Sequence, residues 1–387
     1  MISGIQSFFK PLNPDVYSTK DRWESTQIGR LIDSHVSDHF PDLSSSNIAI
    51  FNVSEYDGSK NESDNLDCKI RAALYDCHVD NFPSVADLGS LLMMSTRKES
   101  FKNIQDVCFF LISHKIIPII IGGGNDVSYA VYKAYAALEK YITISSVDNR
   151  FDIGLENDKL AAFSYLGKII SHKPNYLFHY VNIAYQSYFV SPLAVKLIEG
   201  MNFESIRLGN LRVNFKDIEP IMRNTDFLSF DISAISNSYA KANVYSVPNG
   251  LNGEEACKVL RYAGVSDKIT SIGLFEYNQS MDRDSQTAYL LSQMIWYFIE
   301  GYKSRKNELN PDLKTCIKYT VSLEDGQNQI VFYKSRITGR WWMGVPFKSK
   351  EHKKPNHYFV ACSYSDYEEA NRGEIPKRWI RTSRKLS

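Results

Sequence analysis

Acidic residues follow the ends of two apolar segments that we expect to be strands. Asp148 and Asp152 follow one of these segments, and Asp231 ends the other. Because side chains alternate along an extended chain, Asp148, Arg150 and Asp152 are predicted to converge at one strand end. Carboxylates suit a hard divalent cation, whereas the guanidinium of Arg150 has no lone pair to give and keeps its proton. The spacing therefore predicts a metal-site scaffold that contains a fixed cation from the protein itself.

Two further polar blocks stand where strands are expected to end. The first is a run of three glycines, residues 122–124, followed by Asn125 and Asp126. The chain has no G-K-[ST] and no G-x-G-x-x-G there, so a phosphate loop is discounted. A plain strand-to-helix turn with an Asn or Asp cap is the alternative. The second block, residues 229–236, begins with Ser229 and contains Asp231 and Ser233.

The elements that must position these blocks alternate between strands and helices. This alternation predicts an α/β fold, a three-layer α/β/α domain with a mostly parallel sheet. Right-handed crossovers would place all strand carboxyl ends at one edge, where ligands bind. Strands are expected at residues 47–53, 115–121, 141–147, 176–185, 204–208, 227–232 and 269–275, and helices at 69–75, 100–114, 128–141, 192–199, 253–263 and 287–302.

Three regions are expected along the chain. Residues 1–44 are an N-terminal arm with a helix at 21–40, residues 45–306 are the α/β domain, and residues 307–387 are a C-terminal extension. In the extension, two strand-like runs flank Glu324-Asp325-Gly326, which predicts a β-hairpin. Trp341 and Trp342 are expected to pack the extension onto the main domain. The basic tail, residues 377–385, is expected to form an interface because Trp, Tyr and Arg are enriched at such sites.

The order and spacing of the three blocks resemble those of the arginase/agmatinase/formimidoylglutamase superfamily, the ureohydrolases. The resemblance is strongest to the formimidoylglutamase-like branch and covers residues 45–303. The blocks of that family read G-G-G-H-[DE], D-A-H-x-D and S-x-D-x-D. The resemblance implies a fold of arginase type and two Mn²⁺ ions that share a hydroxide, which attacks a guanidinium or formimino carbon.

The resemblance carries over to four acidic positions. Asp148 and Asp231 stand where the family has its two bridging carboxylates, and Asp152 stands where a ligand of the first metal stands. Glu276 matches the acid that holds the substrate cation. At these four acidic positions the chain keeps the family pattern.

Three other ligand positions depart from the family pattern. Asn125 replaces the histidine of the first metal, Arg150 replaces the histidine of the second metal, and Ser233 replaces its aspartate. The general-acid histidine of the family has no counterpart, since no histidine lies between Asp152 and His172. We expect the Arg150 guanidinium to lie near the lost second metal and to fork onto Asp148 or Asp231.

These departures predict a catalytically inactive homologue with an incomplete di-manganese site. It would act by binding a protein partner or a small cationic, amidino-type ligand held by Glu276. We expect no cofactor; the alternative is one divalent ion, Mn²⁺, Mg²⁺ or Ca²⁺, at Asp148, Asp152 and Asp231. Two other functions stay open, namely an active metal-dependent C–N hydrolase of formimidoylglutamase or agmatinase type, and a structural subunit that docks through its C-terminal extension.

Composition excludes several other classes of protein. The formal net charge is +1 over 387 residues, so no bulk field favours nucleic acid or an anionic membrane. No apolar run is long enough to span a membrane, and the N-terminus lacks the pattern of a signal peptide. The six cysteines have no C-x-x-C spacing, and scattered thiols fit a cytoplasmic protein. The family resemblance implies a homo-oligomer.

Overall fold

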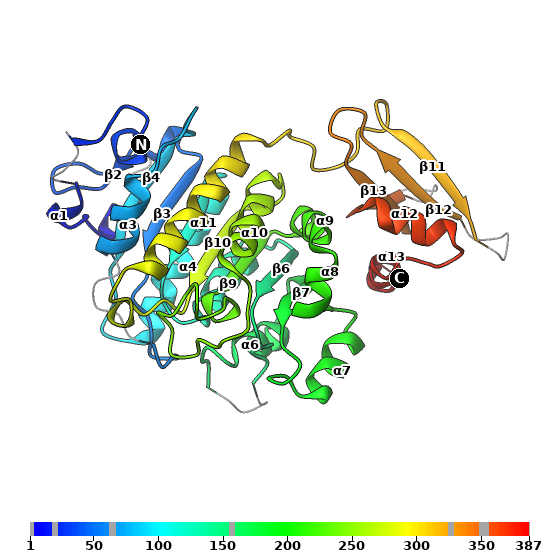
Figure 1. Ribbon diagram of the computed structural model, residues 1–387, viewed down its shortest axis with the longest axis horizontal. Helices are drawn as coiled ribbons and strands as arrows, with labels where there is room; N and C mark the ends of the chain where they lie inside the picture. The colour runs from blue at the N-terminus through cyan, green and yellow to red at the C-terminus, as the bar shows by residue number, and fades with distance from the viewer. Residues whose placement is uncertain are drawn as a thin grey trace.

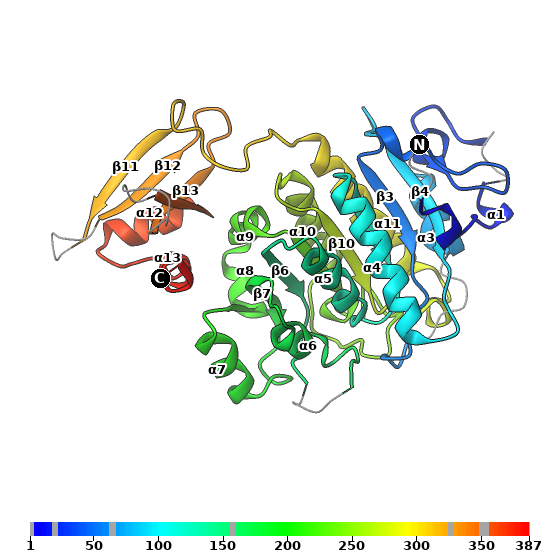
Figure 2. The same ribbon diagram turned by 180° about the vertical axis from the view of Figure 1, so that it is seen from behind.

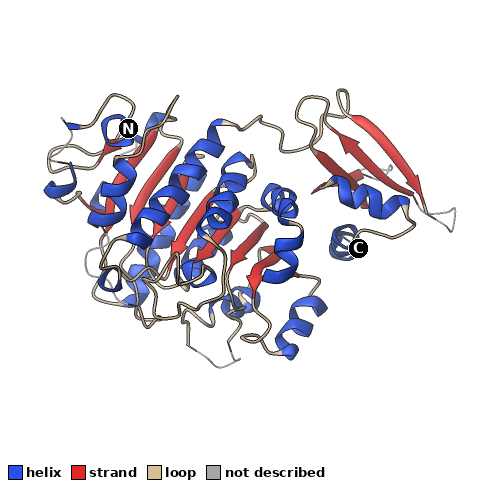
Figure 3. Ribbon diagram, viewed as in Figure 1, coloured by secondary structure: helices blue, strands red, loops and turns tan. Residues whose placement is uncertain are grey.

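The computed structural model describes residues 4–17, 22–61, 67–154, 159–323, 329–347 and 356–386. Its strands form two sheets, one of ten strands and one of four. Figure 1 shows the large sheet with its covering helices at one side of the molecule and the small sheet at the other. The two sheets are also separate in the view coloured by secondary structure (Figure 3).

The large sheet is mostly parallel, as predicted. Its strand order is β1-β4-β3-β5-β10-β9-β6-β7-β8, with β2 also paired to β4, and β1–β4 is its antiparallel pair. The strands are β1 (Phe9–Lys10), β2 (Asp33–Ser34), β3 (Ile48–Asn52), β4 (Val85–Leu91), β5 (Ile117–Ile121), β6 (Ile142–Val147), β7 (Leu177–Tyr185), β8 (Glu204–Arg207), β9 (Phe227–Asp231) and β10 (Ser271–Phe275).

Helices cover both faces of this sheet, which confirms the three-layer α/β/α prediction. Figure 1 shows α3, α10 and α11 in front of the sheet, and Figure 2, from behind, shows α4 and α5 on the opposite face. The longer helices are α3 (Asp67–Tyr75), α4 (Arg97–Ser113), α5 (Val127–Ala137), α6 (Tyr165–Ser171), α7 (Pro192–Gly200), α9 (Ile218–Asn224), α10 (Gly253–Val265) and α11 (Gln286–Lys303). The shorter ones are α1 (Pro14–Tyr17), α2 (Ile28–Leu31) and α8 (Leu208–Val213), with 3₁₀ turns η1 (Gln6–Phe8), η3 (Leu43–Ser45), η4 (Phe215–Asp217), η5 (Ile232–Ala234) and η6 (Gln279–Met281).

The isoleucines of β5 show how the sequence produces this architecture. Ile119 and Ile121 pack into the core on one face of the sheet, and Ile120 packs into the core on the other face. All three are at most 1% exposed. A strand buried on both faces needs apolar residues at every position, so a continuous β-branched run predicts it correctly.

The helix predicted at residues 21–40 is wrong in the part that the structure describes, 22–40. Only α2 forms there, and the chain then continues into β2, where Asp33 pairs with Ala86 of β4. The backbone N–H of His35 donates to the carbonyl of Asp87 at 2.8 Å. The edge of the sheet offers unpaired backbone groups, and pairing with them overrides the helical spacing of the apolar residues.

The C-terminal extension contains the predicted hairpin and more. Its sheet is antiparallel in the order β11-β12-β13-β14, and the hairpin turn at Glu324-Asp325-Gly326 lies outside the described residues. Two further strands follow the hairpin. The first begins with Trp341-Trp342, and the second ends at Cys362. The elements are β11 (Ile317–Ser322), β12 (Gln329–Lys334), β13 (Trp341–Phe347), β14 (Asn356–Cys362), α12 (Tyr364–Asn371) and α13 (Lys377–Leu386).

One arginine of α9 joins the extension to the main domain. The guanidinium of Arg223 donates to the carbonyls of Trp341 at 3.1 Å and Cys362 at 3.0 Å. The same group lies 4.9 Å from the ring centroid of Trp342, which is 1% exposed. The Trp342 ring therefore packs against the main domain, as expected, whereas the Trp341 ring packs inside the extension against Tyr319 and Tyr367.

In the described part of the chain, every helix is too short or too polar to cross a membrane. The cysteines that the structure describes are all free thiols.

Candidate metal centre

Four neighbouring strands of the large sheet position the candidate site. In the order β5, β10, β9 and β6 they lie side by side and run parallel to one another. Their carboxyl ends lead to Asn125, Glu276, Asp231 and Asp148 respectively. Blocks that are far apart in sequence therefore meet at one edge of the sheet, as the parallel topology predicts.

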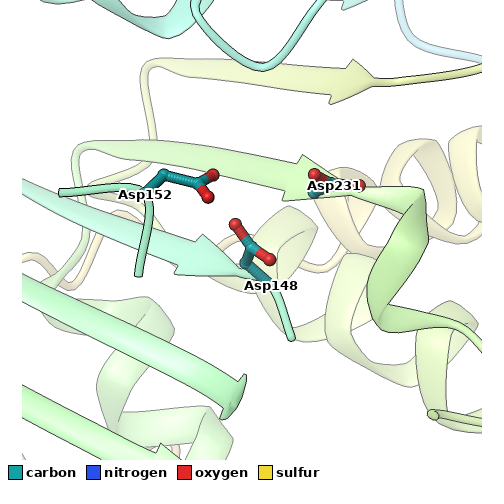
Figure 4. Close-up of side chains that lie close together, drawn as sticks. All are labelled: Asp148, Asp152 and Asp231. Atoms are coloured by element: carbon teal, nitrogen blue, oxygen red, sulfur yellow. The ribbon is translucent and has the colours of Figure 1, made fainter. Parts of the chain in front are cut away.

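Three aspartates form a compact buried cluster at this edge. Asp148, Asp152 and Asp231 each offer an oxygen, and these oxygens lie within 4.8 Å of one another. The residues are 2%, 7% and 5% exposed. Figure 4 shows the carboxylates turned toward one another, with Asp231 at the end of β9 and Asp148 just beyond β6. Of the three residues expected to converge at one strand end, Asp148 and Asp152 lie together here with Asp231, whereas the Arg150 side chain does not join them.

Asp152 reaches the cluster through an unusual backbone conformation. Its φ is 49°, in the left-handed region that aspartate tolerates better than most residues. Its carbonyl accepts the backbone N–H of Leu166 at the start of α6, at 3.1 Å. The turn sends the chain back over the end of β6 and directs the carboxylate toward Asp148.

Asn125 places an amide donor inside the carboxylate cluster. Its Nδ2 donates to Asp152 Oδ2 at 2.9 Å and to Asp148 Oδ2 at 3.3 Å. Its Oδ1 accepts from the Ser229 hydroxyl at 3.0 Å, and Ser229 also shares a hydrogen bond with Ser128. The serine hydroxyl thus orients the amide so that N–H, and not oxygen, faces the acids.

Burial raises the pKa values of all three carboxyl groups. The pKa of Asp148 is held well above its ordinary range by burial and then by the charge of Asp152. Burial raises the pKa of Asp152 to about 7. Burial and the neighbouring charges of Asp148 and Glu276 raise the pKa of Asp231 well above its usual value. Clustered acids without a cation behave this way because like charges repel in a medium of low dielectric.

Arg150 lies next to the cluster but does not form the predicted fork. Among the described residues, no ion pair joins its guanidinium to Asp148 or Asp231, so that prediction is wrong. The guanidinium lies 4.5 Å from the ring centroid of Phe189 and 5.7 Å from that of Phe163. The Arg150 backbone N–H donates to Asp148 Oδ1 at 2.8 Å. Among the described residues, aromatic rings rather than a carboxylate hold the Arg150 guanidinium. The positive charge of Arg150 still lowers the pKa of Asp148.

Ser233 occupies the position next to Asp231 where the family has another acid. Its backbone N–H donates to Asp231 Oδ1 at 2.7 Å, which caps the 3₁₀ turn η5. The side chain is 3% exposed and has only a hydroxyl to offer. Asn149 donates to the Ser233 carbonyl at 2.8 Å and fixes the turn against β6. Ser233 therefore supplies a hydroxyl, and not a carboxylate, beside Asp231.

The Glu276 carboxylate accepts hydrogen bonds from three groups of the protein. The carboxylate is fully buried and accepts from Ser59 Oγ, from Asn61 Nδ2 at 2.6 Å and from the Asn125 backbone N–H at 2.7 Å. Its φ is 68°, a strained value for a residue other than glycine. Burial raises its pKa, and the three donors oppose that rise. Glu276 therefore holds the segment with Ser59 and Asn61 over the site, and its role as a ligand-binding acid stays a prediction.

The sequence did not single out two other residues of the site. Asp126 was considered as a helix cap, but its side chain caps nothing and instead pairs with Arg97. Arg97 also contacts Glu55 at 3.1 Å. Burial raises the pKa of Asp126 to about 7, against the opposing charge of Arg97. The acidic last position of the G-G-G-H-[DE] pattern could have pointed to Asp126, but no local signal could have pointed to Arg97.

The residues present fit one hard divalent cation and do not fit two. Three buried carboxylates whose oxygens lie within 4.8 Å of one another are the oxygen donor set that Mn²⁺, Mg²⁺ and Ca²⁺ prefer. Burial is the largest cause of the raised pKa values of Asp148 and Asp231, and a bound cation would offset that effect. On the other side of Asp148, Arg150 and Ser233 offer no anionic ligand to a second ion.

Similarity to characterised proteins is modest in sequence. The chain is 25% identical over 190 residues to formimidoylglutamase from Staphylococcus aureus. The match spans 47% of this chain and 60% of that enzyme, which is less than two thirds of its length.

Solved structures share the fold of the main domain. Formiminoglutamase from Trypanosoma cruzi, solved with Mn²⁺, superposes with a TM-score of 0.60 at 18% identity, over 67% of this chain and 95% of that one. Formimidoylglutamase from Bacillus subtilis gives a TM-score of 0.64 at 19% identity, over 72% of this chain and 93% of that one. Agmatine ureohydrolase from Thermoplasma volcanium gives 0.55 at 16% identity, over 74% and 97%.

The expectation of no cofactor is therefore corrected. A protein of this fold, the Trypanosoma cruzi formiminoglutamase, contains Mn²⁺, and the present chain keeps a buried triad of aspartates that could hold a metal ion. The expectation gave too much weight to the missing histidines and too little to the three retained carboxylates. Burial makes their shared charge costly, and a cation relieves it.

A family model covers most of the same region as these similarities. The model of the arginase family matches residues 60–300. These residues include all four strand ends of the candidate site, from Asn125 to Glu276. With the sheet order, the three blocks and the aspartate triad, this match shows that the chain belongs to the arginase family.

Proposed function

We propose that this arginase-family chain binds one divalent cation and acts by binding a ligand or protein partner, without hydrolysing a C–N bond. Arg150 is the observation that carries the proposal. Its guanidinium is held against Phe189 and Phe163, beside Asp148, where a second cation would need an anionic ligand. A guanidinium does not lose its proton in a protein, so the charge there is permanent.

The cation would be held by Asp148, Asp152 and Asp231. When bound, such an ion polarises a ligand oxygen and lowers the pKa of bound water. Asn125 could add its amide oxygen only after its side chain turns over, because Ser229 now donates to that oxygen. The backbone N–H groups of Arg150 and Ser233 orient the carboxylates of Asp148 and Asp231.

Proton transfer to a leaving amine has no evident donor in the cluster. In the part of the chain that the structure describes, the metal-binding group is made of three aspartates and includes no histidine. Burial raises the pKa of Asp126 to about 7, near the value that suits a general acid at neutral pH. Its carboxylate, however, is paired with Arg97. An efficient general acid must be free to approach the leaving group, so these residues favour binding over turnover.

A turnover assay tests the proposal. The Mn²⁺-loaded protein is mixed with formimidoylglutamate, agmatine and arginine, and formamide, urea and ammonia are measured. We expect no product above the rate without protein. Sustained turnover that disappears in Asp148→Asn would contradict the proposal and favour an active hydrolase of the kind named among the relatives.

Restoring the missing ligands provides the matched comparison. The variant with Asn125→His, Arg150→His and Ser233→Asp is expected to bind more Mn²⁺ than the wild type, since it regains nitrogen and carboxylate ligands. Ser238→Asp adds the same carboxylate at an exposed position nearby and is expected to leave metal uptake unchanged. Equal uptake by both variants would show that the ligand positions do not determine the metal content.

A further inference from the structure

A small cavity lies between the main domain and the C-terminal extension. Its volume is about 40 Å³. The main domain lines it near the start of strands β6, β7 and β8, at Thr143, His179 and Glu204, and the extension lines it with α13 and β14. The candidate metal centre is at the carboxyl ends of the strands, so this cavity is at the opposite edge of the sheet.

Positive charge dominates the lining of this cavity. Four cationic side chains face it, and Glu204 is the one carboxylate among its lining residues in the described part of the chain. The cationic residues are Lys268, Arg378, Arg381 and Lys385.

Carboxylates pair with three of these cations. Arg381 contacts Glu204 at 3.0 Å, and Arg378 contacts Asp366 at 3.2 Å. Lys268 contacts Asp226 at 3.3 Å, a carboxylate that it shares with Lys140 at 3.1 Å. Lys268, Arg378 and Arg381 therefore each have a carboxylate partner.

Lys385 has no acidic partner within salt-bridge distance among the described residues. Its ammonium donates to His179 Nδ1 and lies 4.8 Å from the ring centroid of Phe203 and 5.6 Å from that of Phe178. A neutral imidazole and two rings supply no full negative charge. The charge of Lys385 is thus partly buried and uncompensated.

The cavity perturbs the titration of the groups that surround it. Burial, followed by the charge of Arg381, lowers the pKa of Lys385 to about 7. Burial and the charges of Lys385 and Arg381 hold the pKa of His179 well below its usual value. Both shifts have the direction expected where cations crowd together without an anion.

We propose that this cavity is an anion site for a phosphate group, either free phosphate or the end of a larger molecule, which bridges α13 and the start of β7. A dianion would offset the charge of Lys385 and add charge-assisted hydrogen bonds to Arg381 and Lys385. Arginine and lysine together are the residues that bind phosphate oxygens in proteins. Because the lining comes from both units, the ligand also ties the extension to the main domain.

Binding of inorganic phosphate to the full chain tests the proposal. Titration calorimetry uses protein stripped of divalent ions, with ionic strength held constant by KCl. We expect phosphate to bind the wild type and to slow amide hydrogen exchange in α13. Lys385→Met is expected to weaken binding by at least about tenfold, because it removes a charge-assisted hydrogen bond.

Two control variants locate the binding. Lys377→Met removes an exposed lysine from the same helix and is expected to bind phosphate as the wild type does. Arg150→Met removes the cation at the metal centre and is also expected to leave phosphate binding unchanged. This control separates failure of the cavity site from failure of the proposed function, which concerns the other edge of the sheet.

Three results would overturn the proposal. They are the absence of phosphate binding by the wild type, equal binding by the wild type and Lys385→Met, and loss of binding in Arg150→Met. Folding is checked by the melting temperature without phosphate, which we expect Lys385→Met to keep or raise because a buried charge is removed. If Lys385→Met does not fold, the wild type and Lys385→Gln supply the same comparison.

Discussion

The Asn125 side-chain amide donates to the Asp152 carboxylate at 2.9 Å, inside a cluster of three buried acids. An N–H of partial positive charge thus occupies a position beside oxygens that suit a metal ion. Ser229 fixes the amide in this orientation through a hydrogen bond of 3.0 Å to Oδ1. The Asn125 amide donates to two of the three carboxylates, Asp148 and Asp152, and a divalent cation would replace that stabilisation.

Asn125→Ala is expected to destabilise the metal-free protein by about 1–3 kcal/mol at pH 7, because buried acceptors lose their donor. Denaturant unfolding with EDTA measures the loss. Saturating Mn²⁺ is expected to recover part of it, since the ion then screens the same carboxylates. An equal loss with and without Mn²⁺ would show that the amide and the ion do not act on a common cluster.

The stability of the metal-free protein is expected to fall as the pH rises through about 7, the raised pKa of Asp152. A carboxyl whose pKa is higher in the folded state stabilises that state below its unfolded pKa, about 3.9, and the benefit is lost above the folded pKa. Melting temperature between pH 5.5 and 8.5 measures this. Asp152→Asn should flatten the dependence.

Mn²⁺ is expected to reverse this trend, because it binds the deprotonated carboxylates. The rise in melting temperature on adding Mn²⁺ should be small at pH 5.5 and larger at pH 8. A rise that does not change with pH would place the ion away from Asp148, Asp152 and Asp231.

Glu276→Gln is expected to cost about 1–3 kcal/mol, because the new NH₂ group replaces either the oxygen that accepts from Ser59 and Asn61 or the oxygen that accepts from the Asn125 backbone. Amide hydrogen exchange at residues 59–61 should become faster in the variant. Ser59→Ala removes a single donor and serves as the milder control. Unchanged exchange in Glu276→Gln would mean that other contacts hold this segment in place.

Trp342→Ala is expected to destabilise the extension by about 3–5 kcal/mol, since a fully buried indole and its contact with Arg223 are removed. Limited proteolysis should then cut within residues 307–387 before it cuts the main domain. Ile337→Ala, at a side chain 75% exposed, is the control that should change little. Simultaneous loss of both regions would indicate a single cooperative unit.

The central strands could be predicted because their residue pattern has one physical explanation. The isoleucines of β5 suit a strand covered on both faces, and Asp148 and Asp231 lie at the carboxyl ends of β6 and β9 in the same sheet. Strand β4 was not predicted, because it contains Asp87 and Gly89. Asp87 is buried there because two side chains of α3, the preceding helix, bind it: Arg71 at 2.7 Å and the Tyr75 hydroxyl at 2.8 Å.

The sequence identified the residues of the candidate site, but it did not predict which side chains contact Arg150. Arg150 was expected to bind a carboxylate, whereas Phe163 and Phe189 from two later loops hold it. No local pattern links these phenylalanines to a residue at the end of β6. The same limit applies to Lys385, whose uncompensated charge emerges only when the extension meets β7.

The Mn²⁺ content of the purified chain tests the central claim most directly. Protein equilibrated with Mn²⁺ at pH 8 and freed of excess ion is analysed for bound metal per chain. One equivalent in the wild type, and none in Asp148→Asn, is the result that the site geometry predicts. Two equivalents in the wild type, with Arg150 and Ser233 unchanged, would contradict it.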